Sequence, residues 1–203
     1  MSSFFTIFND YVRKQVTNER KERKKYRSSY RLTYSILSTT TTTNFKTMKT
    51  KDGLTLSFQV HQQSTDETES QLPPHHVICL HGWLDNSESF SLLAPSVLKG
   101  LTKERRNIKV VCLDFPGHGK SSHKSKDSVP VLNDYVYYVH ELVLHLANES
   151  SSKSKEVSQA TPPPPITPVT IIGHSMGSSV ALIYTSTFRE NVTSLTMIEG
   201  YGP

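Results

Sequence analysis

A Gly-x-Ser-x-Gly motif, Gly173 to Gly177, is the stretch of the chain best suited to chemistry. It follows an apolar β-branched run, residues 169–172, and precedes a helical pattern, so a strand, a sharp turn and a helix are expected in that order. Such a turn exposes a serine at its apex, and its glycines let neighbouring backbone approach closely. We therefore interpret Ser175 as a nucleophile, with the amide of Met176 placed to donate to a developing oxyanion. The competing interpretation is a chance match, because only three of the five positions are fixed.

Strands and helices alternate in the part of the chain that must position this motif. The expected strands are residues 45–50, 54–61, 76–80, 108–113, 169–172 and 192–198. The expected helices run from about Ser87 to a stop at Gly100, over residues 131–146, and onward from Met176. Continuous apolar runs at 76–80 and 108–113 are typical of strands buried on both faces, as in a parallel sheet. This order predicts an α/β fold with a doubly wound, mainly parallel sheet and an edge hairpin that turns at residues 51–53.

Residues 1–43 differ from the rest of the chain in charge and complexity. They hold nine Lys and Arg side chains against three Asp and Glu side chains, a net charge of +6, and they end in a threonine run. We expect a basic, solvated and disordered tail, and a cytoplasmic protein. The alternative is a mitochondrial presequence, since such segments are amphipathic and rich in Arg and Ser. Asp10, Glu19 and Glu22 argue against it, because presequences avoid acids.

Residues 44–203 form the expected globular part. They include a low-complexity segment rich in Ser, Lys and Pro, residues 150–168, which we interpret as a surface insertion between a helix and a strand. Cys79 and Cys112 both lie in apolar, strand-like runs. That setting favours buried free thiols over a disulfide framework.

Composition and motifs exclude several classes of function. Residues 44–203 have a net charge of −1, which offers no groove for a nucleic acid. Gly119-Lys120-Ser121 lacks the first glycine of a phosphate-binding loop, because Asp114 stands at that position. No cluster of His, Cys and acidic residues has metal-ligand spacing, so we expect neither a metal nor another cofactor. No apolar run reaches the roughly 18 residues that a membrane-spanning helix needs, and the oligomeric state is left open.

Three motifs follow expected strands, at the edge where open α/β sheets bind ligands: His81-Gly82-Trp83, residues 114–119 and the Ser175 turn. The stretches HGWLDNSESF, LDFPGHGKSSH, GHSMGSSVA and MIEGYGP resemble the serine hydrolase-like branch of the α/β-hydrolase superfamily. This resemblance covers residues 45–203, apart from the insertion at residues 150–168. Four motifs in register are far more specific than one, and they imply the α/β-hydrolase fold.

The resemblance implies roles for individual residues. Ser175 is the nucleophile, and the amides of Trp83 and Met176 form the oxyanion hole. His81, Asp114, Pro116, Gly117 and His118 are expected to shape the loops under the site, and His174 stands where members of the superfamily vary. The side chains of Trp83 and Leu84 are expected either to line an acyl pocket or to pack beneath a lid.

The acid and the base are less well defined. In α/β-hydrolases the nucleophile is followed by the acid and then by a histidine. Only Glu190 and Glu199 follow Ser175 as acids, and all nine histidines precede it. Glu190 is expected in a helix-to-strand loop remote from Ser175. Glu199 ends the next strand, where some members of the superfamily carry the acid. Glu199 is therefore the candidate acid, with the ordering of a cap entrance as its alternative role.

Two functions follow from these assignments. The first is an esterase-like serine hydrolase that acts on a small-molecule acyl substrate through an acyl-enzyme. In this hypothesis the 203 residues are the N-terminal part of a longer hydrolase, truncated after the strand at 192–198, so the triad is incomplete in this chain. The second is a catalytically inactive binding or scaffold protein that keeps the hydrolase fold.

Overall fold

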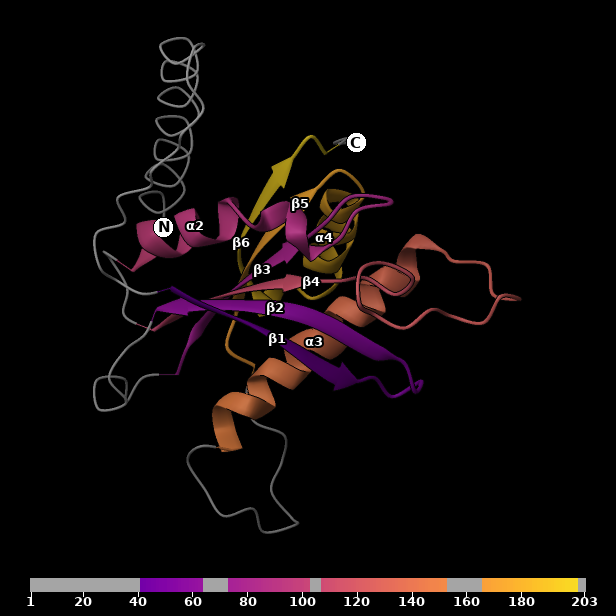
Figure 1. The fold of residues 1–203 in the computed structure, drawn as a ribbon, viewed down its shortest axis with the longest axis horizontal. Coiled ribbons are helices and arrows are strands. Elements are labelled where there is room, and N and C mark those ends of the chain that lie inside the picture. Colours follow the sequence, from indigo (N-terminus) through magenta and orange to yellow (C-terminus); the bar gives the residue numbers. More distant parts are fainter. Residues whose placement is uncertain (1–40, 64–72, 103–106, 153–165, 201–203) are drawn as a thin grey trace, which may run out of the picture. The chain divides into compact units, whose positions relative to one another are not determined.

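The computed structural model describes residues 41–63, 73–102, 107–152 and 166–200. Within them, six strands form one sheet in the order β1-β2-β4-β3-β5-β6 (Figure 1). The strands are β1 (Thr41–Lys49), β2 (Thr55–Gln63), β3 (His75–Leu80), β4 (Ile108–Leu113), β5 (Val169–His174) and β6 (Val192–Ile198). β3 to β6 are parallel to one another, whereas β1 and β2 form an antiparallel hairpin at one edge. The predicted α/β class with a mainly parallel sheet is confirmed.

The hairpin turns where it was predicted to, but it is longer. Gly53 has φ 89°, and its amide donates to the carbonyl of Thr50 at 3.0 Å. This left-handed conformation is open to glycine at no steric cost. β1 begins at Thr41, four residues before the predicted start, and Thr41 pairs with Gln63. Residues 41–43 therefore belong to the sheet, whereas residues 1–40 of the predicted tail lie outside the described residues.

The helices also differ from the prediction at their ends. The single helix expected from Ser87 is a 3₁₀ turn, η1 (Ser87–Phe90), followed by α2 (Leu93–Leu101). Gly100 does not stop α2, because the buried Leu101 extends the packed face of the helix by one more residue. α3 (Leu132–Ser152) runs into the predicted insertion, whose residues 153–165 lie outside the described part.

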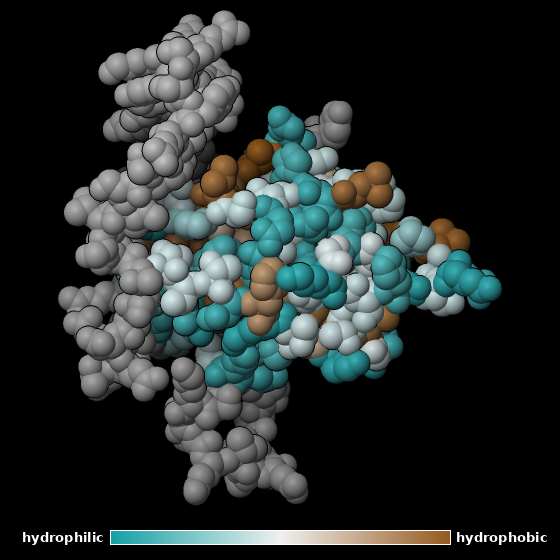
Figure 2. All heavy atoms as spheres, in the orientation of Figure 1, coloured by the Kyte–Doolittle hydropathy of each residue, from teal (hydrophilic) through white to brown (hydrophobic). Residues whose placement is uncertain are grey.

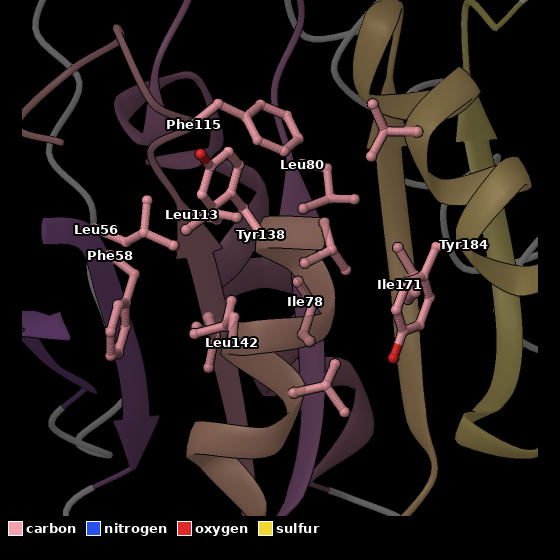
Figure 3. Packing of buried hydrophobic residues seen from close by; sticks show 14 of the residues in the cluster. Leu56, Phe58, Ile78, Leu80, Leu113, Phe115, Tyr138, Leu142, Ile171 and Tyr184 are labelled. Carbon is pink, nitrogen blue, oxygen red and sulfur yellow. The ribbon is translucent and has the colours of Figure 1, made fainter. Parts of the chain in front are cut away.

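The main core lies between the sheet and the helices α3 and α4 (Met176–Thr187) (Figure 3). Alternate residues of the central strands point to this face, as the two-residue period of a strand requires. Its large buried members include Leu56, Phe58, Ile78, Leu80, Leu113, Phe115, Tyr138, Leu142, Ile171 and Tyr184. This core fixes α4 against β5 and β3, so it also fixes the turn between β5 and α4.

The opposite face of the sheet packs against α2 and carries both cysteines. Cys79 and Cys112 are directly opposite in the parallel pair of β3 and β4, and both are fully buried. Both thiols are free, as predicted. The neighbouring Cys79 thiol and burial raise the pKa of Cys112 well above its usual range, so this side chain behaves as a small apolar residue.

Candidate active site

Ser175 lies at the apex of a strained turn between β5 and α4. Its backbone has φ 51° and ψ −118°, a conformation that L-residues seldom adopt. The Ser175 amide donates to the carbonyl of Ile198 at 3.0 Å, and the Ser175 carbonyl accepts from the amide of Ser178 at 2.9 Å. These bonds hold the serine in place at the carboxyl ends of the parallel strands, as the sequence motif predicted.

The two glycines of the motif are required by close backbone contacts. A Cβ atom on Gly177 would lie 2.1 Å from the carbonyl oxygen of Leu80, and one on Gly173 would lie 2.6 Å from the carbonyl oxygen of Gly177. No real side chain tolerates such distances. The hydroxyl of Ser178 adds a bond to the carbonyl of Gly173 at 2.8 Å. Helix α4 thus approaches β3 and β5 as closely as their backbones allow.

The loop after β3 reaches Ser175 through Gly82. A Cβ atom on Gly82 would lie 3.3 Å from the Cβ of Ser175, so the Gly82 backbone packs directly on the serine. The next residue is Trp83, and Met176 follows the serine at the start of α4. Among the described hydrogen bonds, none uses the amide of Trp83 or of Met176 as a donor. Neither amide is therefore engaged by a backbone carbonyl in the described part of the chain.

His81 fixes the start of this loop. Its ring is fully buried. Nδ1 lies 2.7 Å from the carbonyl oxygen of Gly82, and Nε2 accepts the amide proton of Phe115 at 3.0 Å. Because a carbonyl only accepts, Nδ1 carries the proton and the ring is neutral. Burial lowers the pKa of His81, which favours this neutral form.

Asp114 fixes the other end of the loop. Its carboxylate accepts from the amide of Ser87 at 2.7 Å and from the amide of Lys120 at 2.9 Å. It is 1% exposed, and a Cβ atom on Gly119 would lie within 2.5 Å of it. Asp114 therefore ties η1 to the loop after β4. The loop-shaping role that the resemblance implied for His81 and Asp114 agrees with these contacts.

Two apolar side chains project from the same loop. Trp83 is 56% exposed, with its ring edge-on to that of His118 at 5.5 Å between centroids. Leu84 is 82% exposed and has φ 58°. On the face drawn in Figure 2 the hydrophobic residues form separate groups within a largely hydrophilic surface. Trp83 and Leu84 therefore expose apolar side chains on the loop whose Gly82 backbone packs on Ser175.

Glu199 follows β6, directly after the residue that binds the Ser175 amide. Its φ is 50°, and its carboxylate lies 3.6 Å from Nε2 of His174. The sequence alone predicts no contact for His174. No spacing signal pairs two residues 25 positions apart, and only the parallel register of β5 and β6 brings them together. The catalytic role of Glu199 stays a prediction.

Histidines are plentiful near the sheet, but none of the described hydrogen bonds joins one to Ser175. Nδ1 of His118 lies 3.1 Å from the carbonyl of Pro116. His174 faces Glu199, and both ring nitrogens of His81 are engaged. Ser175 therefore has no base among the hydrogen-bond partners that the structure describes.

The described ranges hold neither a metal-binding cluster nor a membrane-spanning helix. No group of three or more His, Cys, Asp or Glu side chains there could hold a metal ion. No helix among the same residues is long and apolar enough to cross a membrane.

Comparison with known proteins agrees with this geometry. A family profile described as "alpha/beta hydrolase fold" matches residues 75–203. Serine hydrolase-like proteins of Danio rerio and Homo sapiens are each 33% identical to the chain, over 126 and 129 residues. The matches cover 62% and 64% of this chain but 31% and 50% of those proteins. The chain thus spans between about a third and a half of the length of these relatives.

More distant matches have named activities of their own. A monoacylglycerol lipase of Rattus norvegicus is 29% identical over 122 residues, 60% of this chain and 29% of that protein. The thioesterase domain from a curacin biosynthetic pathway has a TM-score of 0.58 at 19% identity, covering 80% of this chain and 48% of that domain. At that identity the structural likeness shows a shared fold.

Proposed function

The chain belongs to the α/β hydrolase fold family, and on this basis we propose that Ser175 is the nucleophile of a serine hydrolase acting on ester-type bonds. The observation that carries the proposal is the conformation of Ser175, with φ 51° and ψ −118°. Strain of this kind costs about 1–3 kcal/mol and persists only where the surroundings enforce it. Here two glycines and the bond to Ile198 enforce it. Such strain is concentrated at functional sites, and it presents the serine hydroxyl to a substrate.

The proposed reaction has two steps. In the first, Oγ of Ser175 loses its proton to a base and attacks the carbonyl carbon of the substrate. The carbonyl oxygen becomes negative and is bound by the amides of Trp83 and Met176. The C–O bond then breaks, the alcohol leaves with the proton held by the base, and an acyl-enzyme remains. In the second step, water gives a proton to the base and attacks the acyl-enzyme, and the base returns that proton to Oγ of Ser175 as the acid is released. Neither step needs a cofactor.

The substrate class is a small molecule with an apolar acyl group. The exposed side chains of Trp83 and Leu84 stand on the loop that packs on Ser175, where an acyl chain would extend. The monoacylglycerol lipase among the relatives supports an ester in preference to an amide.

The acid and the base belong to the proposal for the complete protein. Glu199 is one candidate acid, and a residue beyond Pro203 is the other. We propose that the base is a histidine supplied from outside these 203 residues. This is supported by the position of all nine histidines before Ser175, and by the length of the relatives.

Ester hydrolysis in the protein expressed from the complete gene tests the proposal. We expect p-nitrophenyl esters to give a burst of one nitrophenol per protein, followed by slower turnover, because an acyl-enzyme accumulates. Ser175→Ala should abolish the burst. The control is Ser179→Ala, one turn along the same helix, which should keep it. A folded wild-type protein that behaves like Ser175→Ala would contradict the proposal.

A second function is favoured by one observation: none of the described hydrogen bonds joins a histidine to Ser175. We therefore keep a catalytically inactive binding or scaffold protein as the alternative. In that case the complete gene product would fold cooperatively, show no burst, and still bind an apolar acyl compound at the Trp83 loop. Retained binding in Trp83→Ala would exclude that form of the alternative.

A further inference from the structure

Backbone strain gathers at one edge of the sheet. Four non-glycine residues among those described have positive φ: Leu84, Asn107, Ser175 and Glu199. Asn107 precedes β4, whereas the other three follow β3, β5 and β6 at the edge that carries Ser175. A left-handed conformation costs free energy in any residue with a Cβ, so local contacts must maintain each of these three.

His174 is the side chain that lies between these strand ends. Its Nε2 atom is 3.6 Å from the carboxylate of Glu199. On its other side, the ring packs on the Gly82 backbone, because a Cβ atom placed there would lie 3.2 Å from Nδ1 and 3.4 Å from Cε1. The absence of a side chain at Gly82 thus provides the space that the imidazole occupies. One ring therefore contacts the loop after β3 and the residue after β6.

Asp85 lies on the loop after β3. Partial burial raises the pKa of Asp85, but bonds from the Ser89 hydroxyl and from the amide of Asn86, with a smaller electrostatic contribution from His174, lower it overall. A second carboxylate thus interacts electrostatically with His174, besides that of Glu199.

The end of β6 is coupled to the nucleophile. The carbonyl of Ile198 accepts the amide proton of Ser175, and Glu199 is the next residue. A displacement of Glu199 would therefore also disturb the bond that holds the serine in its strained conformation. The same displacement would move the candidate acid of the reaction.

We propose that His174 is a positioning residue that acts through Glu199. Its imidazole is held by the Gly82 backbone and in turn holds the otherwise exposed Glu199 carboxylate at the end of β6. This inference rests on the proposed function of Ser175. His174 itself is not the base, because its Nε2 faces Glu199 and none of the described hydrogen bonds links its ring to Ser175.

The test is a double-mutant cycle on the rate at which a fluorophosphonate labels Ser175 in the complete gene product. The four proteins are the wild type, His174→Ala, Glu199→Ala and the double variant. The side chains of His174 and Glu199 are 34% and 83% exposed, and loss of an ion pair this exposed changes a rate by about two- to fivefold. We therefore expect His174→Ala to slow labelling by that factor. In the Glu199→Ala background the same substitution should have no effect. His174→Gln, whose amide still donates to a carboxylate, should restore most of the rate.

A matched pair elsewhere in the fold supplies the control. His145 and Glu149 on α3 have the same 3.6 Å separation, and His145→Ala should leave the labelling rate unchanged. The inference is overturned if His174→Ala slows labelling equally with and without the Glu199 side chain. It is also overturned if the wild type is labelled and His174→Ala is labelled at the same rate. If the folded wild type is not labelled, the proposed function fails and the inference fails with it. Thermal unfolding followed by circular dichroism distinguishes a variant that is folded but labelled slowly from one that is unfolded.

Discussion

Asp114→Asn is the substitution whose cost can be worked out most directly from the structure. The carboxylate accepts two backbone amides, those of Ser87 and Lys120, and is 1% exposed. Asparagine keeps the shape but replaces one oxygen with an NH₂ group, which cannot accept. Whichever way the amide is turned, either the buried amide of Ser87 or the partly buried amide of Lys120 loses its acceptor and faces another donor.

The expected loss of stability follows from these two bonds. A buried donor left without a partner costs about 1–3 kcal/mol, and a hydrogen bond to a charged group contributes about 1.5–3 kcal/mol. We therefore expect Asp114→Asn to lower the free energy of unfolding by about 2–3 kcal/mol. For a domain of this size that corresponds to a decrease in Tm of roughly 4–12 °C. Because the carboxylate also anchors the end of the Trp83 loop, fluorophosphonate labelling of Ser175 should slow as well.

Denaturant unfolding of Asp114→Asn beside Asp127→Asn provides the assay. Asp127 is exposed and lies on the same connection between β4 and α3, and its substitution should change stability by less than about 0.5 kcal/mol. Equal midpoints for the two variants would refute the assignment of Asp114 as the residue that joins η1 to the loop after β4.

Three further predictions follow from the site and the core. Ser175→Gly should stabilise the fold by about 1 kcal/mol in denaturant unfolding, because glycine adopts a positive φ without strain. The same variant should not be labelled. An unchanged or lower stability would contradict the strain at Ser175. Gly177→Ala should cost about 3 kcal/mol or more, because its Cβ would lie 2.1 Å from the Leu80 carbonyl oxygen, whereas Ser179→Ala should be tolerated. Burial, with Lys109 nearby, lowers the pKa of His76 to about 4, below the roughly 6.5 of an unfolded histidine. The unfolded chain therefore binds more protons between these values, and stability should fall by about 3 kcal/mol as the pH drops from 6.5 to 4. His76→Gln should remove that part of the slope, and an unchanged pH profile would count against it.

The nucleophile turn could be predicted from sequence because its requirements are local. Gly173 is needed by contacts within one strand-turn-helix unit, and the apolar periods on either side mark that strand and that helix. Gly177 is needed by the Leu80 carbonyl of the neighbouring β3, a contact that the motif signals although the sequence does not show its partner. The loops at His81 and Asp114 follow apolar strands in the same way. The residues of their motifs, rather than the apolar periodicity, identified these loops as parts of one site.

Contacts that depend on strand register could not be predicted. His174 meets Glu199 only because β5 and β6 pair in parallel with an irregularity between Val169 and Thr170, and a shift of one residue would turn the side chains to the other face. Thr41 joins β1 because β2 offers it a partner in Gln63, which outweighs the low complexity of the threonine run. Gly100 lies inside α2 because its neighbour Leu101 is buried. The cytoplasmic location and the disordered state of residues 1–40 stay predictions.

Mass spectrometry of the fluorophosphonate adduct identifies the nucleophile directly. The complete gene product is treated with the probe, digested, and searched for the modified peptide, with Ser175→Ala and Ser179→Ala treated in parallel. We expect one adduct, on Ser175, that is lost in Ser175→Ala and kept in Ser179→Ala. An adduct on another residue, or equal labelling of the folded wild type and Ser175→Ala, would contradict it.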